Sequence, residues 1–324
     1  MTETKKQLIG KLKLGDEVET QVLVVEAHYL NYSAPHRAGE QFMRLLLGDV
    51  SGTIKGIMWD LNLAGEPVKE GDVLYIKGEV TEYHGLQIVL REARKLDPSQ
   101  VNRRLLQPAA QRDPQEMLEE LREIITEEVK DTYLLKLLRS FFSDREFVQK
   151  FALSPAAKTI HHNYIGGLLE HTLEVVKFCL KMAEVYPEQI QSEMLVSGAI
   201  LHDVGKIEEY DPYSFNFELT DRGKLIGHIT LGKELLNERV NRIENFPEEL
   251  NMELEHIILT HHGHREWGSP ETPKTIHAFA VFHADLLSAR LGQFTNVMQK
   301  KSSDESNWTD WDRFLERSIY LKKN

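Results

Sequence analysis

Short runs of alternating apolar and polar residues fill the first part of the chain. Between residues 17 and 94, stretches rich in Val, Ile, Leu and aromatic residues are separated by turn signals such as Asp49-Val50-Ser51-Gly52. This pattern is typical of β-strands joined by turns. It predicts five strands, over residues 17–30, 41–50, 53–60, 72–83 and 86–94. Five strands in about 80 residues, with no long helix among them, suit a small closed β-barrel.

From Pro114 onward, apolar residues recur every three or four positions, which is the spacing of amphipathic helices. The run MLEELREIITEEVK is the first of them. Further helices are expected near residues 132–152, 167–185, 193–207, 224–243, 249–262, 273–291 and 308–320.

Between these two patterns, residues 98–114 contain three prolines and show no clear period. The sequence therefore predicts a multidomain protein. An N-terminal all-β barrel covers residues 1–98, a linker covers 99–114, and an all-α domain covers 115–324.

Composition agrees with two globular domains. The chain has 324 residues, of which 41% are hydrophobic and 28% charged, and single cores rarely exceed about 250–300 residues. No apolar run approaches the ~18 residues of a membrane span, and the N-terminus lacks the apolar block of a signal peptide. The single cysteine, Cys179, excludes a disulfide framework and a Cys-rich zinc module. We therefore expect a cytoplasmic protein that does not bind membranes.

The charge is acidic, and the histidines are clustered. The formal net charge is −12, so a nucleic-acid ligand would require a local basic groove or bound metal ions. Of the 14 histidines, eleven lie between His161 and His283. This clustering is the first indication of function.

Several of these histidines, and two aspartates, fall on apolar helical stripes. A lone histidine there is usually a hydrogen-bonded core residue, whereas an unpaired buried carboxylate is costly. Several imidazoles and two carboxylates that face inward from different helices are what a carboxylate–imidazole metal site requires. The residues in question are His171, His202, Asp203, His261, His262 and Asp285.

The order of these residues resembles that of the HD-domain superfamily of metal-dependent phosphohydrolases. The matching features are His171, the pair His202-Asp203 within HDVGK, and Asp285 within FHADLL. The resemblance implies that these four residues hold one metal ion. It also implies a second ion, held by His228 in KLIGHI and by His261 in THHG, with Asp203 bridging the two. A pair of such ions would activate water and clamp a phosphodiester for hydrolysis.

The segments HHNYIGGLLEHT and HHGHREWGSP, together with the preceding barrel, resemble the YhaM-type 3′→5′ exoribonucleases, which combine an OB-fold with an HD domain. This resemblance covers nearly the whole chain. It implies metal-dependent removal of nucleotides from the 3′ end of single-stranded RNA. Single-stranded DNA is a second substrate compatible with this resemblance. The direction of digestion follows from the resemblance alone.

Residues near the motifs are candidates for contact with the substrate. Lys206 lies one turn after His202 and Asp203, and we expect it to bind a phosphate oxygen or the charge that develops there. His162 and Arg265 flank the motif segments and are further candidates. For His262 the sequence leaves three roles open: a metal ligand, a donor to a ligand, or a proton donor to the substrate.

The ligand types constrain the metal weakly. Imidazole and carboxylate without thiolate suit Mn, Fe, Co, Ni or Zn better than Mg or Ca. The family resemblance favours Mn²⁺. The sequence leaves the oligomeric state open and is compatible with a homo-oligomer.

Aromatic side chains of the barrel are candidates for stacking on nucleic-acid bases, which tolerates any sequence. We expect at least half of these rings to lie in the barrel core instead. The rings are Tyr29, Tyr32, Phe42, Trp59, Tyr75 and Tyr83, and the candidate phosphate partners are Arg37, Arg44, Lys55, Arg91 and Arg94.

Two alternative functions compete with a nuclease. The first is an HD phosphohydrolase of small nucleotides or cyclic dinucleotides, with the barrel used for assembly. An OB-like barrel argues against it, because a small-molecule phosphatase does not need one. The second is a non-catalytic nucleic-acid-binding protein with a relic HD domain. The complete set of inward-facing ligands argues against that one, because a relic loses buried charges first.

Overall fold

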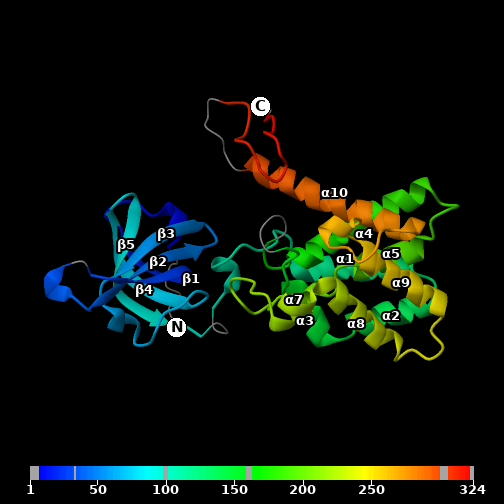
Figure 1. Cartoon of the computed structure of the whole chain (residues 1–324), viewed down its shortest axis with the longest axis horizontal. Helices are drawn as coiled ribbons and strands as arrows, with labels where there is room; N and C mark the ends of the chain where they lie inside the picture. Colours follow the sequence, from blue (N-terminus) through cyan, green and yellow to red (C-terminus); the bar gives the residue numbers. More distant parts are fainter. Residues whose placement is uncertain (1–6, 33, 98–100, 158–162, 300–305, 322–324) are drawn as a thin grey trace. The chain divides into compact units, whose positions relative to one another are not determined.

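The computed structural model describes residues 7–32, 34–97, 101–157, 163–299 and 306–321. The chain divides into two compact units. The first comprises residues 1–109 together with 213–218, and the second comprises 110–212 and 219–324. Figure 1 shows strands in the first unit and helices in the second, as the sequence predicts.

The first unit is a closed barrel of five strands in the order β1-β2-β3-β5-β4. Strand β1 pairs antiparallel with both β2 and β4, and β3 runs parallel to β5. This is the strand arrangement of an OB-fold. The strands are β1 (Glu17–Asn31), β2 (Gln41–Asp49), β3 (Gly52–Met58), β4 (Val73–Glu82) and β5 (Leu86–Lys95), with short 3-10 turns η1 (Ile9–Lys11), η2 (Pro35–Arg37), η3 (Leu61–Ala64) and η5 (Arg103–Leu105). The prediction of five strands is confirmed.

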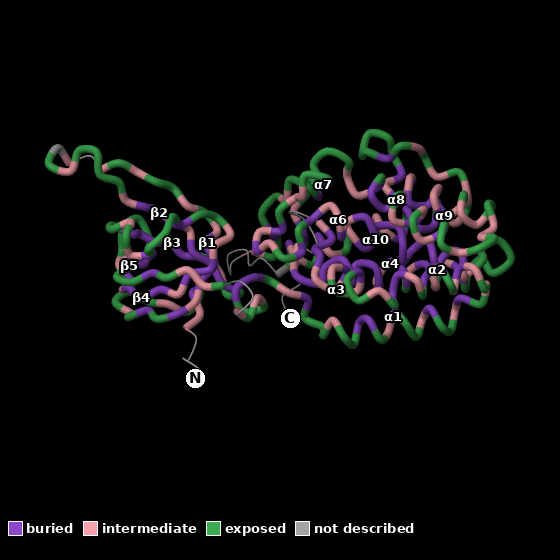
Figure 2. Tube along the Cα trace, turned by 90° about the horizontal axis from the view of Figure 1, so that it is seen from below, coloured by how far each residue is buried: buried purple, intermediate pink, exposed green. Residues whose placement is uncertain are grey.

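The barrel interior follows from the alternation of side chains along each strand. In β2, Met43 and Leu45 are buried, whereas the alternating residues Phe42 and Arg44 lie on the outer face. The end of β1 and the start of β2 extend beyond the barrel as a largely exposed hairpin arm (Figure 2).

The second unit is all-α. Its helices are α1 (Pro114–Glu128), α2 (Thr132–Phe142), α3 (Arg145–Leu153), α4 (Gly167–Val185), α5 (Ser192–Leu201), α6 (Lys206–Glu209), α7 (Asp221–Ile226), α8 (His228–Val240), α9 (Glu248–Thr260) and α10 (Ile276–Gln299), with a 3-10 turn η6 (Arg265–Trp267). The first three helices begin after an aspartate, Asp113, Asp131 or Asp144, whose carboxylate accepts hydrogen bonds from the first free backbone N–H groups.

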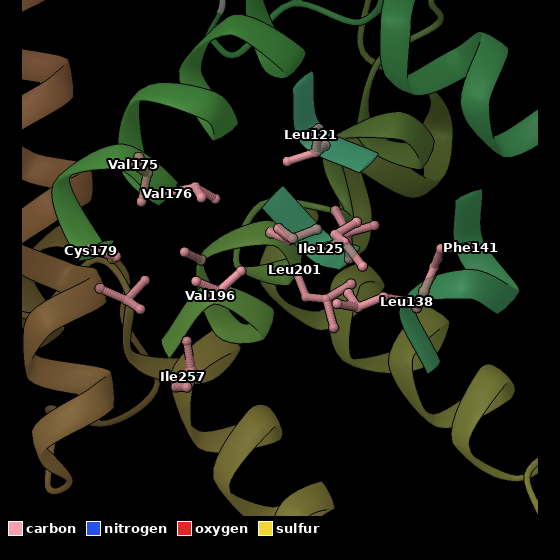
Figure 3. Close-up of a cluster of buried hydrophobic side chains, with 14 of the residues drawn as sticks. Leu121, Ile125, Leu138, Phe141, Val175, Val176, Cys179, Val196, Leu201 and Ile257 are labelled. Atoms are coloured by element: carbon pink, nitrogen blue, oxygen red, sulfur yellow. The ribbon is translucent and has the colours of Figure 1, made fainter. Parts of the chain in front are cut away.

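Helices α4 and α5 form the centre of this unit. Every residue of α5 from Met194 to Leu201 is buried, so its sequence shows no polar face. Figure 3 shows the surrounding apolar cluster, in which Val196 and Leu201 of α5 lie among side chains of other helices, including Leu138 and Ile257. Cys179 is buried in the same cluster, as expected of a core residue. No helix in the described ranges is long and apolar enough to cross a membrane.

Some predicted helices are wrong in extent. The segment expected near 132–152 is two helices, because the Asp144 carboxylate starts α3. The segment 308–320 is not a helix at all. There Trp308 bridges Tyr320, and the Asp312 carboxylate accepts from the backbone N–H of Phe314 and Leu315. Such local side-chain hydrogen bonds compete with helix formation.

Two segments outside the predicted barrel belong to the first unit. Leu106, in the stretch that the sequence suggests as a linker, is buried there together with Phe215, Leu23 and Val73. Phe215 comes from residues 213–218, between α6 and α7, where the Tyr210–Leu219 bridge closes a loop. The Gln107 side chain donates a hydrogen bond to the Phe215 carbonyl at 3.2 Å.

Candidate metal centre

Two helix ends supply adjacent pairs of candidate ligands. Helix α5 ends at Leu201 and is followed directly by His202 and Asp203. Helix α9 ends at Thr260 and is followed by His261 and His262. The predicted helices 193–207 and 249–262 therefore stop earlier than expected, at or just before these pairs. His202 and His261 are the C-cap residues and keep right-handed helical dihedrals, so each pair stands at the last turn of its helix.

Glycines allow these turns to pack closely. A Cβ atom on Gly205 would lie 2.0 Å from the backbone oxygen of His228, so glycine lets the start of α8 contact the turn after Asp203. Gly263 has a φ of +76°, and a Cβ atom there would lie 2.2 Å from the ring of Phe282. Both turns therefore need a residue without a side chain.

A first group of ligand atoms comes from α4, the turn after α5, and α10. The Nε2 atoms of His171 and His202 lie 3.3 Å apart. The Oδ2 atom of Asp203 lies 3.6 Å from the first and 3.4 Å from the second. The Oδ1 atom of Asp285 lies 3.1 Å from His171 Nε2. These four side chains face one another, as the sequence predicts.

A second group uses the other oxygen of Asp203. Its Oδ1 atom lies 3.3 Å from His261 Nε2 and 3.7 Å from His228 Nε2. The Nε2 atom of His262 lies 3.3 Å from that of His228. Ligand atoms of His228, His261 and His262 all lie within 4.8 Å of one another. The two oxygens of Asp203 thus face two different groups of imidazoles.

Hydrogen bonds at the far side of each ring fix its tautomer. The Nδ1 atoms of His202 and His261 lie 2.7 Å from the carbonyls of Ala199 and Ile258, and that of His262 lies 3.1 Å from the Trp267 carbonyl. Since a carbonyl only accepts, these Nδ1 atoms donate, and each Nε2 keeps a lone pair directed at the cluster.

The rings of His228 and His171 are held by carboxylates, the first directly and the second through a hydroxyl group. His228 Nδ1 lies 3.0 Å from Glu209 Oε1. His171 Nδ1 lies 2.9 Å from the hydroxyl of Ser288, which donates at 2.6 Å to Glu174. Partners of this kind orient metal-binding histidines and raise their basicity.

The ligand atoms fit a cation. Asp203 Oδ1 and His261 Nε2 are buried and have no hydrogen-bond partner among the described residues. Leaving such atoms unpaired costs free energy, and lone pairs that face each other at 3.3 Å cannot satisfy one another. A divalent ion that binds between these atoms removes this cost. Imidazole nitrogens and carboxylate oxygens together form the donor set of Mn, Fe, Co, Ni or Zn sites.

The protonation states agree with this arrangement. Burial lowers the pKa of His171, of His261 and of His262, the last to about 3, so these rings are neutral near pH 7. Burial also disfavours the charged form of Asp203, but Lys206 and His202 outweigh it and hold the pKa of that carboxyl well below its usual value. Burial lowers the pKa of His202, but the adjacent Asp203 carboxylate outweighs burial and raises it overall, so this ring, unlike the other three, must release a proton to bind a metal ion.

A cavity of about 630 Å³ lies over the candidate centre. His228, His261, His262 and Asp285 line it, and so does Lys206, whose Nζ atom lies 2.5 Å from Asp203 Oδ2. The remaining walls are formed by aromatic, small and polar side chains. The cavity is within the size range of ligand sites in proteins.

The other sequence-predicted contacts fall elsewhere. Arg265 is exposed and forms a bidentate ion pair with Glu271 at 2.8 and 2.9 Å. His162 lies outside the described residues. The sequence reasoning missed Glu209, Glu174 and Ser288, because acidic and hydroxyl residues on mixed helical faces carry no signal of a partner far away in the sequence.

The barrel carries its own groove, of about 920 Å³. Phe42, Trp59 and Tyr83 line it together with Arg44 and Lys55. The expectation that half of the candidate rings are core was wrong: none of the six is buried, and Trp59 and Tyr83 are 44% and 66% exposed. These rings share the outer strand face with charged residues.

A cluster of rings extends the groove toward the hairpin arm. The rings of Tyr32, Phe42 and Trp59 are mutual neighbours, with centroids 4.9 to 5.8 Å apart, and the Arg37 guanidinium lies 3.4 Å from the centre of Tyr32. Arg91 is instead paired with Glu17 and Glu79, so its charge is already balanced.

Comparison with known proteins places both units in one family. Residues 168–290 match the HD domain. The 3'-5' exoribonuclease YhaM of Oceanobacillus iheyensis is 30% identical over 292 residues, which are 89% of this chain and 88% of that protein. The YhaM protein of Listeria welshimeri is 29% identical over 82% of this chain and 84% of its own. The second OB-fold domain of replication protein A from Methanococcus maripaludis is 26% identical over 28% of this chain and 95% of that one, with a TM-score of 0.25. Since the Oceanobacillus relative matches along nearly the whole length of both proteins, the chain belongs to the YhaM family of 3′-5′ exoribonucleases and is a hydrolase.

Proposed function

We propose that this chain removes nucleotides from the 3′ end of single-stranded RNA by metal-dependent hydrolysis in the cavity over the candidate centre. One observation carries the proposal. The Nε2 atoms of five histidines and both oxygens of Asp203 converge beside the cavity, and within the described ranges Asp203 Oδ1 and His261 Nε2 have no hydrogen-bond partner. The relatives named 3'-5' exoribonuclease supply the substrate class and the direction.

Two divalent ions would be held by these residues. The first would take His171, His202, Asp203 and Asp285, and the second Asp203, His228 and His261. His262 joins the second set, because its Nε2 atom faces His228 and its Nδ1 donates to a carbonyl. Mn²⁺ suits these ligands better than Mg²⁺, which prefers oxygen and retains its water.

The ions would supply a reactive water at neutral pH and positive charge on the phosphodiester. The residues of the chain position them and the substrate. Asp203 brings the two sets of ligands together, since its oxygens face one set each. Lys206 reaches the cavity from the same turn and offers an ammonium group to a phosphate oxygen. Glu209 holds the ring of His228 through both its backbone N–H and its Nδ1, each 3.0 Å from Glu209 Oε1.

The barrel groove would hold the strand that awaits digestion. Exposed rings of Trp59 and Tyr83 offer faces for base stacking, and Arg44 and Lys55 offer positive charge. Stacking does not require a 2′-hydroxyl, so single-stranded DNA would bind as well. The groove also argues against a phosphohydrolase of small nucleotides, which needs no second binding surface.

The test is digestion of single-stranded RNA labelled at its 5′ end, after chelation and with Mn²⁺ restored. We expect a descending ladder of labelled products that appears only with the metal. The Asp203→Asn variant, which removes one charge at nearly constant size, should leave the RNA intact. An RNA that stays intact with the wild-type protein while a cyclic dinucleotide is hydrolysed would overturn the proposal in favour of a small-nucleotide phosphohydrolase.

A further inference from the structure

The lining of the cavity over the candidate centre includes a stretch of α10 that runs from Phe282 past Asp285 to Arg290, and the two ends of this stretch differ in chemistry. One end lies beside His262 and is formed by Trp267 and Phe282. The other lies beyond Asp285 on α10 and is formed by Leu286, Ala289 and Arg290, among others. All of these residues belong to the second unit.

The first end is aromatic and lacks an available cation. Trp267 is 51% exposed, and its backbone carbonyl accepts the Nδ1–H of His262, which ties the turn that carries the ring to the candidate ligands. His264 packs edge-on against the Trp267 ring, with centroids 4.5 Å apart. Arg265 lies in the same 3-10 turn, but its Nη2 atom is paired with both carboxylate oxygens of Glu271, and the residue is not part of the cavity lining.

The second end is cationic. Arg290 follows Asp285 by five residues, or roughly 7.5 Å along a helix that rises 1.5 Å per residue. Its guanidinium contacts only neutral acceptors, Gln293 Oε1 at 3.5 Å and the Phe314 carbonyl at 3.3 Å. Within the described part of the chain it forms no ion pair with a carboxylate. Its charge is therefore available to an anion.

This asymmetry matches the two sides of a phosphodiester at a 3′ end. Beyond the bond to be cut, a terminal nucleoside has a base and a 3′-hydroxyl but no further phosphate, so its subsite needs an aromatic surface and no cation. On the other side, the next nucleotide carries another phosphate, so its subsite needs a positive charge.

We propose that Trp267 stacks on the 3′-terminal base and that Arg290 binds the first phosphate on the 5′ side of the bond being cut. This assignment rests on the proposed function. The two residues set the polarity of the strand in the cavity. They are substrate-binding residues of the helical unit and act independently of the barrel groove.

Dinucleotides test this proposal with the full-length protein, because two nucleotides fill both subsites. The first comparison is a dinucleotide with a 5′-phosphate against the same dinucleotide without it. The wild-type protein should cleave the phosphorylated form with a kcat/KM higher by about tenfold or more, since a charged hydrogen bond contributes roughly that much. Arg290→Gln should remove the preference, so that this variant cleaves the two forms with about the same kcat/KM. Arg290→Lys should retain part of it.

The second comparison replaces the 3′-terminal nucleotide by an abasic one. Loss of the base should lower wild-type kcat/KM by about fivefold to a hundredfold, the usual range for one stacked base. Trp267→Ala should lower cleavage of the normal dinucleotide by the same factor and make the two substrates equal, whereas Trp267→Phe should restore part of the difference. The matched control for Arg290→Gln is Arg242→Gln. It removes an exposed arginine that is paired with Glu238 of α8, and it should behave as wild type.

A preference for the 5′-phosphate that survives in Arg290→Gln, or a base effect that survives in Trp267→Ala, would overturn the assignment. So would degradation of long RNA without cleavage of either dinucleotide. Failure of the wild-type protein on every RNA tested would instead overturn the proposed function.

Discussion

Asp203 Oδ1 lies 3.3 Å from His261 Nε2, and neither of these buried atoms has a hydrogen-bond partner in the part of the chain that the structure describes. The Nδ1 proton of His261 is directed at the Ile258 carbonyl, and burial lowers the pKa of the ring, so its Nε2 presents a lone pair to a carboxylate oxygen. Two acceptors in contact are unfavourable until a cation lies between them. A bound cation therefore accounts for this arrangement at the centre of the fold, which would be unfavourable without one.

Lys206 should act on the substrate and not on the metal. Lys206→Ala should retain the bound ions and lower kcat by about 10²–10³, the range for one removed electrostatic group at a reacting centre. Lys233→Ala, which removes an exposed lysine of α8 paired with Glu255, should leave both quantities unchanged. Metal content and RNA turnover should be measured on the same preparations. Loss of metal in Lys206→Ala would assign the residue to the centre's assembly.

Gly205 should be required for the second ion in particular. A Cβ atom there would lie 2.0 Å from the His228 backbone oxygen, so Gly205→Ala must push the start of α8 away from Asp203. We expect the affinity for the second ion to fall while the first is kept, as measured by titration with Mn²⁺. Gly232→Ala, on α8 itself, is the control, because a Cβ atom there meets its neighbours at 3.4 Å and above. Equal loss of both ions in Gly205→Ala would contradict the division into two sets.

Asp144 should give the helical unit a pH-dependent part of its stability. Its carboxylate accepts a hydrogen bond from Arg239 at 2.6 Å, which lowers the pKa of Asp144. Because the folded-state pKa lies below the unfolded value of about 3.9, the stabilisation is present above that pH and is lost as the pH falls through the folded-state value. Asp144→Asn keeps the helix cap, since Asn caps as well as Asp, but loses the charge.

Urea unfolding at a series of pH values should therefore show Asp144→Asn less stable than wild type at pH 7, with the difference shrinking below about pH 4. Asp131→Asn caps α2 in the same way, and Asp131 forms no ion pair in the described residues, so it should show no such trend. A difference for Asp144→Asn that stays constant with pH would mean that the charge pair contributes nothing.

Trp59 should contribute to the affinity for long RNA and not to the chemistry. Trp59→Ala should weaken binding of a long single strand by about fivefold to a hundredfold and leave cleavage of a dinucleotide unchanged. This substitution is a cleaner test than removal of the barrel, because residues 213–218 pack into the barrel unit and deletion would leave Phe215 uncovered. Equal affinity of Trp59→Ala and wild type for long RNA would leave the groove without a role in binding.

The pattern along the chain predicts the two fold types and brings the candidate ligands to notice. His171 and Asp285 are conspicuous because each interrupts an apolar helical stripe. The outward position of Phe42 and Trp59 also follows from the alternation of side chains, since Phe42 shares a strand face with the charged Arg44, and Trp59 with the charged Lys55.

Other features depend on contacts that no local pattern marks. Glu209 is one of many acidic residues on helices, and only the fold brings it to His228. Residues 213–218 form an ordinary connection between two helices. Phe215 nevertheless packs with Leu23, which precedes it by 192 positions in the sequence, and with Val73, which precedes it by 142. Long-range packing of this kind decides which side chains orient the ligands and which loop joins which unit.

The central claim is that Asp203 joins two metal ions, and a count of bound Mn²⁺ per chain tests it most directly. The protein is stripped with a chelator, reloaded, freed of excess metal and analysed by plasma mass spectrometry, alongside Asp203→Asn. The account predicts two ions per wild-type chain and loss of most of the metal in the variant, because both sets of ligands share that carboxylate. A single ion in the wild-type protein, or a full complement in Asp203→Asn, would contradict it.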